Sequence, residues 1–586
     1  MGKLSKPALD PITVEVVRAH YESTARQMRN VLIRTSFNPV IYEMVDFSLG
    51  VYNEKAELIA EGPGIPFFMG ALTFAIREIV QYVGAENIVE GDVLLSTYPY
   101  WTGSHPQDAV LVKPIFVDGK IFGYASAKAH WMDIGAKDIY GIDTTDSFQE
   151  GLKIFGAKVV KRGTLDPEIV DIVRANSRLP ESAIGDLTAQ ISACNLGSRR
   201  VLELVEKYGA ETVRRATERI LDHGEEIARR EIAAMPEGEW EAEASMDNNG
   251  ITDEPVRLKV RIRIAKGEMH VDTSGSSAQQ VGPVNCPLGT SISFVRLVMM
   301  MVVAPGYTAN EGFFRPLKVN IPEGSVLNPV APAPVFLYSW SAFQMGDAMF
   351  KAFAQAVPGR SVARSGGDIG GLLFSWCAAR DGKFNAGGWD ESVGQGASLE
   401  ADGESALVHY SLGQSRNVPI EIAEQRYPVH VECYEIWNDS AGAGRFRGGF
   451  GVRKFWRAKE QLSLIATIEQ TQFPGWGIDG GGCGKPNRLM LAAGTQAARP
   501  VGKISGYKVQ PGERLELYMG GGGGWGDPLT REPARVLTDV VGGYISAESA
   551  ARDYGVVVAG QGPKAFIDET ETDKLRKARH ATGITS

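Results

Sequence analysis

The sequence predicts an α+β protein of several structural units: a mixed α/β N-terminal part, a helical layer and a β-rich C-terminal half. The chain has 586 residues, which is too long for a single hydrophobic core. Helical periodicity dominates up to about residue 235, and an alternation of apolar and charged residues begins near Glu237. We therefore expect four parts, which span residues 1–164, 165–235, 236–527 and 528–586.

The N-terminal part opens with a predicted helix over residues 10–36, which Asp10 can cap and in which Pro11 suits the first turn. Runs of β-prone residues between turn residues predict a sheet after it. Asp118-Gly119 marks a hairpin turn between two of its strands. The expected elements are a hairpin at 46–59, a helix at 69–82 and strands at 92–97, 109–116 and 121–127.

Residues 165–235 carry apolar residues at helical spacing with charges opposite, which predicts a helical layer or an oligomer contact. The segment 256–275 alternates apolar and charged residues and predicts an amphipathic hairpin. Strand-like stretches continue to about residue 525, with one helical segment near 291–303. The residues from 528 to the end predict a small tail with two short helices.

Charge and cysteine usage exclude several classes of protein. The net charge is −9 and no basic stripe is present, so nucleic acid is not an expected partner. No apolar run approaches the ~20 residues that a membrane span needs. The five cysteines are scattered and form no CxxC pair, which is typical of a reducing cytoplasm and argues against a thiolate zinc site.

Two copies of one pattern are the strongest chemical signal. His105-Pro-Gln-Asp108 and His130-Trp-Met-Asp133 each place a carboxylate three residues after an imidazole, in a chain with only 8 histidines. His and Asp together are ligands for a divalent ion such as Zn or Mn. Their closeness in the chain suggests convergence on one site. The alternative is two separate loop histidines, each hydrogen-bonded to its own neighbour.

Other residues could complete such a site. Asp46 directly precedes a predicted strand and could add a carboxylate, or could simply make a hydrogen bond where that strand begins. Tyr100, Trp101 and Trp131 could wall a pocket for a small-molecule substrate, or could belong to an ordinary core. The polar loop at 143–151 suits either a supporting position beside the site or a solvated surface.

The glycine-rich segments do not predict a nucleotide site. Glycines cluster at 480–484 and 520–524, but neither segment has the GxxxxGK[ST] order or opens a helix after a strand. No GxGxxG in a Rossmann context, GxSxG or HExxH occurs. We therefore expect no nucleotide to bind this chain.

The sequence resembles the hydantoinase B family, the B-type subunits of ATP-dependent hydantoinases and 5-oxoprolinases. The resemblance runs nearly end to end and rests on many segments in the same order. They are DPITVEVV at 10, VDFSLGVYN at 45, GSHPQDAVLVKPIFVDGK at 103, AKAHWMDIG at 127, TTDSFQEG at 144, DTSGSSAQQVGPVN at 272, PEGSVLNP at 322, DSAGAGRFRGGFG at 439 and GGGGGWGDPLTR at 520.

This resemblance implies a partner, an A-type ATPase subunit that binds ATP and Mg, and a hetero-oligomer of (αβ)2 or larger. In the implied scheme the partner phosphorylates the carbonyl oxygen of a lactam or hydantoin, and water completes ring opening on the B-type chain. The resemblance also places the metal ligands on Asp46, His105, Asp108 and His130. We expect a Zn or Mn ion there to lower the pKa of water. Asp133 would assist as the catalytic residue, either as a general base on that water or by orienting an imidazole.

Several neighbours differ from the family pattern. Met44-Val45 precedes the first ligand where many relatives carry a basic residue, Thr97-Tyr98 replaces Asn-Asp, and Trp131 stands where His is common. These changes predict a larger, more aromatic pocket, which leaves a lactam, a substituted hydantoin or a ketone possible as substrate. A role in an ATP-dependent ketone carboxylase is therefore one alternative function. A non-catalytic scaffold with a structural metal is another.

Overall fold

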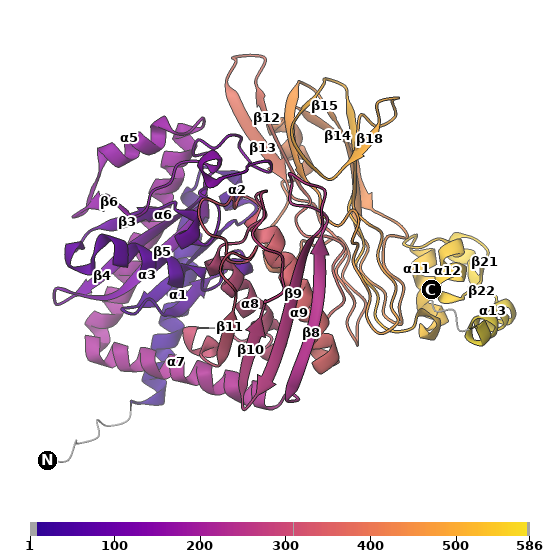
Figure 1. The fold of residues 1–586 in the computed structure, drawn as a ribbon, viewed down its shortest axis with the longest axis horizontal. Coiled ribbons are helices and arrows are strands. Elements are labelled where there is room, and N and C mark those ends of the chain that lie inside the picture. The colour runs from indigo at the N-terminus through magenta and orange to yellow at the C-terminus, as the bar shows by residue number, and fades with distance from the viewer. Residues whose placement is uncertain (1–8, 309, 583–586) are drawn as a thin grey trace.

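A seven-stranded antiparallel sheet forms the centre of the N-terminal part in the computed structural model, which describes residues 9–308 and 310–582 (Figure 1). Its strand order is β2-β1-β5-β4-β3-β6-β7. The strands are β1 (Phe47–Asn53), β2 (Leu58–Gly62), β3 (Val93–Ser96), β4 (Asp108–Val117), β5 (Lys120–His130), β6 (Ala157–Lys161) and β7 (Thr164–Leu165). The strands predicted from the sequence are thus found, with small shifts at their ends.

Helices cover both faces of this sheet, so alternate strand residues enter two different cores. Leu111 packs with α1 and α6 on one face, whereas Val110 and Val112 pack with α3 on the other. Because both faces are buried, β4 and β5 are apolar almost throughout. The helices of this part are α1 (Pro11–Thr35), α2 (Pro39–Tyr42), α3 (Ala71–Val83) and α4 (Pro99–Thr102).

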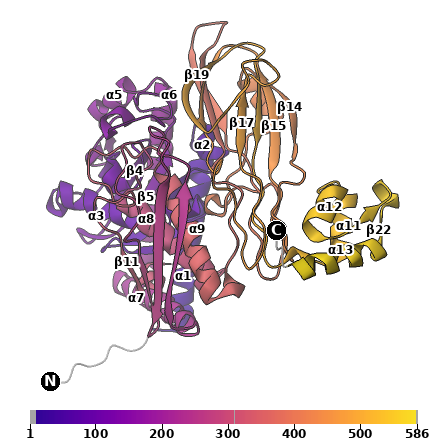
Figure 2. The ribbon, with the colours of Figure 1, turned by 45° about the vertical axis from the view of Figure 1, so that its right-hand side comes forward.

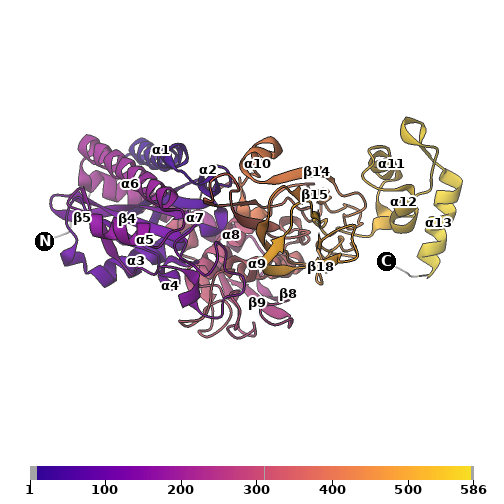
Figure 3. The same ribbon diagram turned by 90° about the horizontal axis from the view of Figure 1, so that it is seen from above.

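The predicted helical layer consists of α5 (Pro167–Ala175), α6 (Pro180–Tyr208) and α7 (Ala210–Ala233). The α6 helix lies along α1 and covers β4 and β5 (Figure 3). Gln190 of α6 reaches into the sheet and donates hydrogen bonds to the carbonyls of Ala109 and Ala127. The layer therefore fixes the strands that end near the two histidine motifs.

A four-stranded sheet, in the order β11-β10-β9-β8, follows α7 and packs on the second of two long helices that lie against each other. One of them, α8 (Leu288–Val303), was expected. The other, α9 (Tyr338–Ala356), was not, because it is buried on nearly every side and so lacks the polar face that marks a helix in a sequence. The strands are β8 (Gly238–Met246), β9 (Val256–Ala265), β10 (Glu268–Asp272) and β11 (Leu317–Asn320).

The β-rich C-terminal half contains two further sheets around one core, with strand orders β13-β12-β16-β19 and β14-β15-β20-β17-β18. The short helix α10 (Ile420–Arg426) lies beside them. The strands are β12 (Gly371–Cys377), β13 (Phe384–Trp389), β14 (Val429–Ile436), β15 (Val452–Ala458), β16 (Leu462–Thr467), β17 (Arg488–Leu491), β18 (Arg499–Val501), β19 (Lys503–Val509) and β20 (Arg514–Tyr518).

Glycine-rich segments outside these strands run side by side and are hydrogen-bonded through their backbones. The N–H groups of Gly522, Gly523 and Gly524 donate to the carbonyls of Gly449, Arg364 and Gly482, at 3.0, 2.8 and 3.0 Å. The contact is so close that a Cβ atom on Gly448 would lie 1.8 Å from the Gly522 carbonyl oxygen. These three N–H groups therefore donate to protein carbonyls and are not available to bind a phosphate.

The C-terminal tail forms a small helical unit with its own core, and it projects from the rest of the chain (Figure 2). The two short helices expected from the sequence are present. A third helix and a two-stranded sheet were not expected. The elements are α11 (Pro533–Val541), α12 (Ala547–Tyr554), β21 (Val558–Ala559), β22 (Phe566–Ile567) and α13 (Glu569–Thr582).

The predicted class, a multi-unit α+β fold with helices and several sheets, is confirmed. The composition change near residue 235 falls in the turn between α7 and β8. We retain the division at residues 164, 235 and 527 as a proposal. Within residues 9–308 and 310–582, no helix is both long enough and apolar enough to cross a membrane.

Candidate metal centre

The two histidine motifs meet because β4 and β5 are adjacent antiparallel strands. Asp108 is the first residue of β4 and His130 is the last residue of β5, and the two are direct partners in the register. Side chains of directly opposite residues lie on the same face of a sheet. His105 lies in the turn just before β4, so its imidazole reaches the same place. Residues 25 positions apart in the chain thus converge on one point.

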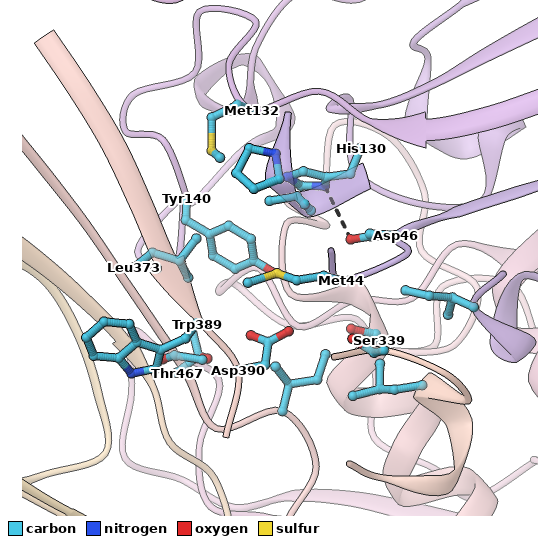
Figure 4. A pocket seen from close by; sticks show the side chains of 18 of the residues that line it. Met44, Asp46, His130, Met132, Tyr140, Ser339, Leu373, Trp389, Asp390 and Thr467 are labelled. Atoms are coloured by element: carbon cyan, nitrogen blue, oxygen red, sulfur yellow. Dashed lines mark hydrogen bonds and ion pairs between the residues drawn. The ribbon is translucent and has the colours of Figure 1, made fainter. Parts of the chain in front are cut away.

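The polar atoms of this cluster are close together and buried. His105 Nε2 lies 3.0 Å from His130 Nδ1 and 3.2 Å from Asp108 Oδ1. His130 Nδ1 lies 3.1 Å from the same Asp108 oxygen and 3.9 Å from Asp46 Oδ2. The alternative of two separate loop histidines is therefore excluded. The dashed line in Figure 4 marks the contact between His130 and Asp46.

The spacing of these atoms fits a metal ion. Ligand atoms about 2.0–2.1 Å from a tetrahedral ion lie roughly 3.3 Å apart. The three contacts among His105, Asp108 and His130 are within a few tenths of an ångström of that value. Asp46 lies at the edge of this group of three, with its Oδ2 next to His130, and its buried Oδ1 atom has no hydrogen-bond partner among the described residues. A cation bound beside this carboxylate would satisfy that unpaired oxygen.

Surrounding groups fix the orientation of the ligand atoms. His105 Nδ1 lies 2.9 Å from the carbonyl oxygen of Phe336, so this nitrogen carries the proton and Nε2 keeps its lone pair for a ligand. Tyr338, at the start of α9, donates its hydroxyl to Asp108 Oδ2 at 2.8 Å. Supports of this kind, outside the ligand set, are typical of metal sites in proteins.

The electrostatics of the cluster also favour a cation. Burial raises the pKa of Asp46, against the attraction of His130. Burial alone would raise the pKa of Asp108 as well, but His105, His130 and Lys128 hold it well below its usual range. Lys128 is fully buried, and burial lowers its pKa to about 8 despite the carboxylates nearby. A divalent ion would balance both carboxylates at once.

Glu150 supports the cluster from behind. Its fully buried carboxylate accepts hydrogen bonds from the backbone N–H groups of Val335 and Phe336 at 2.8 and 2.9 Å, and from Thr144 Oγ1 at 2.8 Å. Phe336 is the residue whose carbonyl contacts His105. Glu150 thus holds the segment that orients the imidazole, in line with a supporting position for the polar loop at 143–151.

A cavity opens beside the ligand cluster, where three parts of the chain meet (Figure 4). About 60 Å³ of it is open to the centres of water molecules, which is room for a few waters or one small ring. The N-terminal part contributes one wall, the start of α9 another, and the sheet containing β12 and β13 a third. The labelled lining residues in Figure 4 are Met44, Asp46, His130, Met132, Tyr140, Ser339, Leu373, Trp389, Asp390 and Thr467.

Comparison with known protein families decides what kind of protein carries this centre. The family profile described as Hydantoinase B/oxoprolinase matches residues 10–528, which is nearly the whole chain. The chain belongs to the hydantoinase B/oxoprolinase family. The resemblance inferred from the sequence segments is thereby confirmed.

Two relatives match this chain along nearly their whole length. The putative B-type chain of a D-/L-hydantoinase from a Pseudomonas species is 31% identical, with 97% of this chain and 98% of that one covered. The β chain of the caprolactamase from Pseudomonas jessenii is 32% identical, with 97% of this chain and 99% of that one covered. Both are named as subunits of a larger enzyme.

Solved structures share the fold. The crystal structure of the ATP-dependent caprolactamase from Pseudomonas jessenii superposes with a TM-score of 0.89 at 30% identity, over 97% of this chain and 100% of that one. The nucleotide-free structure of acetone carboxylase also gives a TM-score of 0.89, over 98% of this chain and 83% of that one. Its identity is only 20%, so this second likeness shows the fold alone.

Asp133, the expected catalytic base, points away from the centre in this family member. Its buried carboxylate forms a two-point ion pair with Arg178, at 2.5 Å to Nη2 and 3.0 Å to Nε. It also accepts hydrogen bonds from the backbone N–H groups of Arg178 and Gly135. The structure therefore does not support a catalytic role for Asp133, because its oxygens accept hydrogen bonds from Gly135 and Arg178 and so stabilise the loop after β5.

The three expected substrate-binding aromatics do not line the cavity either. Trp131 directly follows His130, so the alternation of a strand turns its ring to the opposite face, where its N–H donates to Gln190 at 2.7 Å. Tyr100 and Trp101 lie on the short helix α4. Tyr100 donates to the carbonyl of Ala333, and Trp101 stacks in a half-buried aromatic cluster. Their placement does not support the substrate contacts expected for them.

The sequence did not reveal the residues that actually form the other walls. Tyr338, Trp389 and Asp390 come from parts of the chain more than 200 residues beyond His130, with no motif around them. Tyr140 lies a few residues after the second motif, and Met132 lies within it, but neither was singled out. Met132 and the supporting residue Glu150 carried a signal, since both lie in segments that resemble the family.

Proposed function

We propose that this chain is the B-type subunit of an ATP-dependent cyclic amide hydrolase, active together with an A-type ATPase partner. The observation that carries the proposal is the cluster of His105, Asp108 and His130 beside a small cavity, with Asp46 at its edge next to His130. The names of the hydantoinase and caprolactamase relatives support this reaction class. We further propose a hetero-oligomer of (αβ)2 or larger, acting in the cytoplasm.

The division of labour follows from the stability of amides. Resonance makes a lactam carbonyl a poor electrophile, and transfer of a phosphoryl group to its oxygen makes the ring carbon reactive. We propose that the partner binds ATP and Mg and performs this transfer, and that water opens the activated ring in the cavity of this chain. The engaged N–H groups of the glycine-rich segments support the assignment of ATP to the partner.

In this scheme Asp46, His105, Asp108 and His130 would hold a divalent Zn or Mn ion. The ion would supply an activated water and would stabilise negative charge that develops on the substrate. The carbonyl of Phe336 keeps Nε2 of His105 free of its proton. Tyr338 holds the second oxygen of Asp108, so only one oxygen of that carboxylate faces the other ligand atoms.

A purely structural metal is the less favoured alternative. A structural site is normally closed by four protein ligands, whereas a catalytic site keeps an open position. Here Asp46, His105 and His130 all line the cavity, so a ligand could approach the ion from that side. This geometry favours catalysis over a scaffold role.

The test is to co-purify the chain with its partner ATPase and to measure metal content and ring opening of cyclic amides. His105→Ala and His130→Ala should each reduce bound metal to well below one ion per chain and abolish ring opening. His430→Ala is the matched control, because His430 is exposed and contacts only the nearby Glu424. If either cluster variant keeps both its metal and full turnover, the proposal is wrong.

A ketone carboxylase is the second candidate function, favoured by the shared fold of acetone carboxylase. It makes a different prediction with the same complex. Labelled bicarbonate would be incorporated into a ketone product, and no amino acid would be released from a cyclic amide. Release of an amino acid without incorporation of label excludes the carboxylase.

A further inference from the structure

Asp390 faces the ligand cluster from the opposite wall of the cavity. It directly follows Trp389, the last residue of β13, and its carboxylate points into the open space (Figure 4). No described residue donates a hydrogen bond or an ion pair to it, whereas the adjacent Glu391 is paired with the buried Lys454 at 2.7 Å. Burial and the charge of Glu391 raise the pKa of Asp390 to about 6. A carboxyl group that faces a cavity without a protein partner is available to bind a ligand in that space.

The charges around the cavity restrict what that ligand can be. Among the described residues that line it, the carboxyl groups are those of Asp46 and Asp390, the imidazoles are those of His105 and His130, and there is no Lys or Arg. A substrate with a carboxylate substituent, such as 5-oxoproline, would bring a third negative charge next to Asp46 and Asp390. The only cation in the cavity to balance that charge would be the metal ion in the cluster. The cavity therefore favours a ring without a charged substituent.

Much of the remaining lining is apolar, although Ser339, Thr467 and Tyr140 also contribute polar groups. Met44, Met132, Leu373 and Trp389 lie around the space between Asp46 and Asp390 (Figure 4). Flexible methionine side chains adapt to the shape of a saturated ring, and an aromatic face packs well against methylene groups. These walls suit the carbon skeleton of a lactam, with its carbonyl group toward the ligand cluster and its nitrogen toward Asp390.

We infer that Asp390 binds the ring nitrogen of an uncharged lactam and carries protons to that nitrogen during ring opening. The inference rests on the proposed function and adds a catalytic residue and a substrate class to it. As an acceptor, the carboxylate binds the ring N–H of the substrate. A lactam with a free N–H and no charged substituent is thus the class that the site selects.

The proton balance requires such a group. When water adds to the ring carbon of the O-phosphorylated lactam, a C–O bond forms. The ring C–N bond then breaks, and its electron pair stays on nitrogen. Both hydrogens of the water end on the nitrogen, which keeps its own ring hydrogen and leaves as a protonated amine. The carbon becomes an acyl phosphate, which a second water hydrolyses to a carboxylate and inorganic phosphate. Asp390 takes each proton released from the water side and donates it to nitrogen, so it ends in the protonation state in which it began.

The experiment compares variants in the reconstituted complex with the partner ATPase. The probes are ε-caprolactam, its N-methyl derivative and 5-oxoproline. For the wild type we expect ε-caprolactam to be opened with a kcat/KM at least 100-fold above that of 5-oxoproline. Asp390→Asn should lower kcat for ε-caprolactam by about 100-fold or more while bound metal stays unchanged. Asp390→Glu should recover about tenfold of that loss, because it restores a carboxyl group.

Asp381→Asn is the matched control, since Asp381 is an exposed carboxyl group on the turn that joins β12 and β13. It should leave turnover unchanged. A second readout is discrimination against the N-methyl lactam, which offers no N–H. The wild type should prefer the N–H lactam strongly, and Asp390→Ala should bring the two kcat/KM values close together. Binding of ε-caprolactam to the metal-loaded complex, measured by calorimetry, should weaken in Asp390→Asn.

The inference is overturned if Asp390→Asn keeps turnover within threefold of the wild type, or if 5-oxoproline is the better substrate. Its failure is distinguishable from failure of the proposed function. If only the inference about Asp390 fails, His105→Ala still abolishes metal binding and turnover, whereas Asp390→Asn does not affect turnover. If the wild-type complex opens no lactam, the role of Asp390 is wrong, and if it opens no cyclic amide of any kind, the proposed function is wrong as well.

Discussion

Replacing Asp133 by alanine separates a structural role of this residue from a catalytic one. The carboxylate is 1% exposed and accepts hydrogen bonds from two backbone N–H groups, those of Gly135 and Arg178. It also pairs through both oxygens with the Arg178 guanidinium. The substitution would leave these donors without a partner where the chain passes from the end of β5 toward α6.

The cost can be worked from these contacts. Hydrogen bonds to a charged group contribute about 1.5–3 kcal/mol each when buried. The Arg178 side chain is 33% exposed, so its part is discounted to about 0.5–1 kcal/mol. Because water can enter the space left by the carboxylate, we expect a total loss of about 3–4 kcal/mol. For a unit the size of the N-terminal part this corresponds to a decrease in Tm of roughly 6–16 °C.

The assay is thermal unfolding followed by intrinsic fluorescence, together with metal content and turnover measured well below the Tm. Asp133→Ala should unfold earlier but keep its metal and most of its activity. Asp171→Ala is the control, because Asp171 forms an exposed ion pair with Arg174 and should shift the Tm by no more than ~2 °C. An unchanged Tm with a loss of turnover of more than 100-fold would refute this reasoning and restore Asp133 as the base.

Three further changes test other parts of the structure. Glu150→Gln replaces one carboxylate oxygen, an acceptor, with an NH2 donor beside the backbone N–H groups of the segment that orients His105. It should weaken metal affinity by about 10–100-fold in a chelator competition. Unchanged affinity would contradict this role. Burial raises the pKa of Glu61 from 4.5 to about 7, so the folded chain holds that proton more tightly and its stability falls as pH rises across this window. Glu61→Gln should remove this pH dependence, so the Tm of the variant minus that of the wild type should increase between pH 5 and 8. Parallel plots of Tm against pH for the two proteins would count against this role of Glu61. Gly448→Ala places a Cβ atom 1.8 Å from a carbonyl oxygen and should yield no soluble protein. The control is Gly359→Ala, whose Cβ atom would lie 4.0 Å from its nearest neighbouring atom and should be tolerated. Equal yields of the two variants would disprove the steric argument.

The elements that could be predicted from sequence are those with one buried and one exposed face. The α1 helix and the β9–β10 hairpin show the periodicity of their burial directly. The α9 helix is buried on nearly all sides, so its pattern carries no period, and it was missed. Tertiary burial, rather than local preference, determines such an element.

The same limit applies to the candidate site. His105, Asp108 and His130 could be found because two adjacent strands bring their motifs together, and strand pairing is local in the sequence. Asp390 could not, because its position depends on how a distant sheet docks against the N-terminal part. Trp131 was misassigned since nothing in its neighbourhood indicated on which side of the strand end its ring would lie.

The backbone-to-backbone packing of the glycine segments bears on how evolutionary variation in such chains should be interpreted. Where a single methyl group has no room, selection removes every other amino acid irrespective of chemistry. We therefore expect these positions to be among the least variable in any future alignment, although they lie outside the cavity lining. Choosing residues for mutagenesis by invariance alone would select these glycines and not the residues that line the cavity. The room available for a side chain at a position therefore has to be considered before an invariant residue is taken as catalytic.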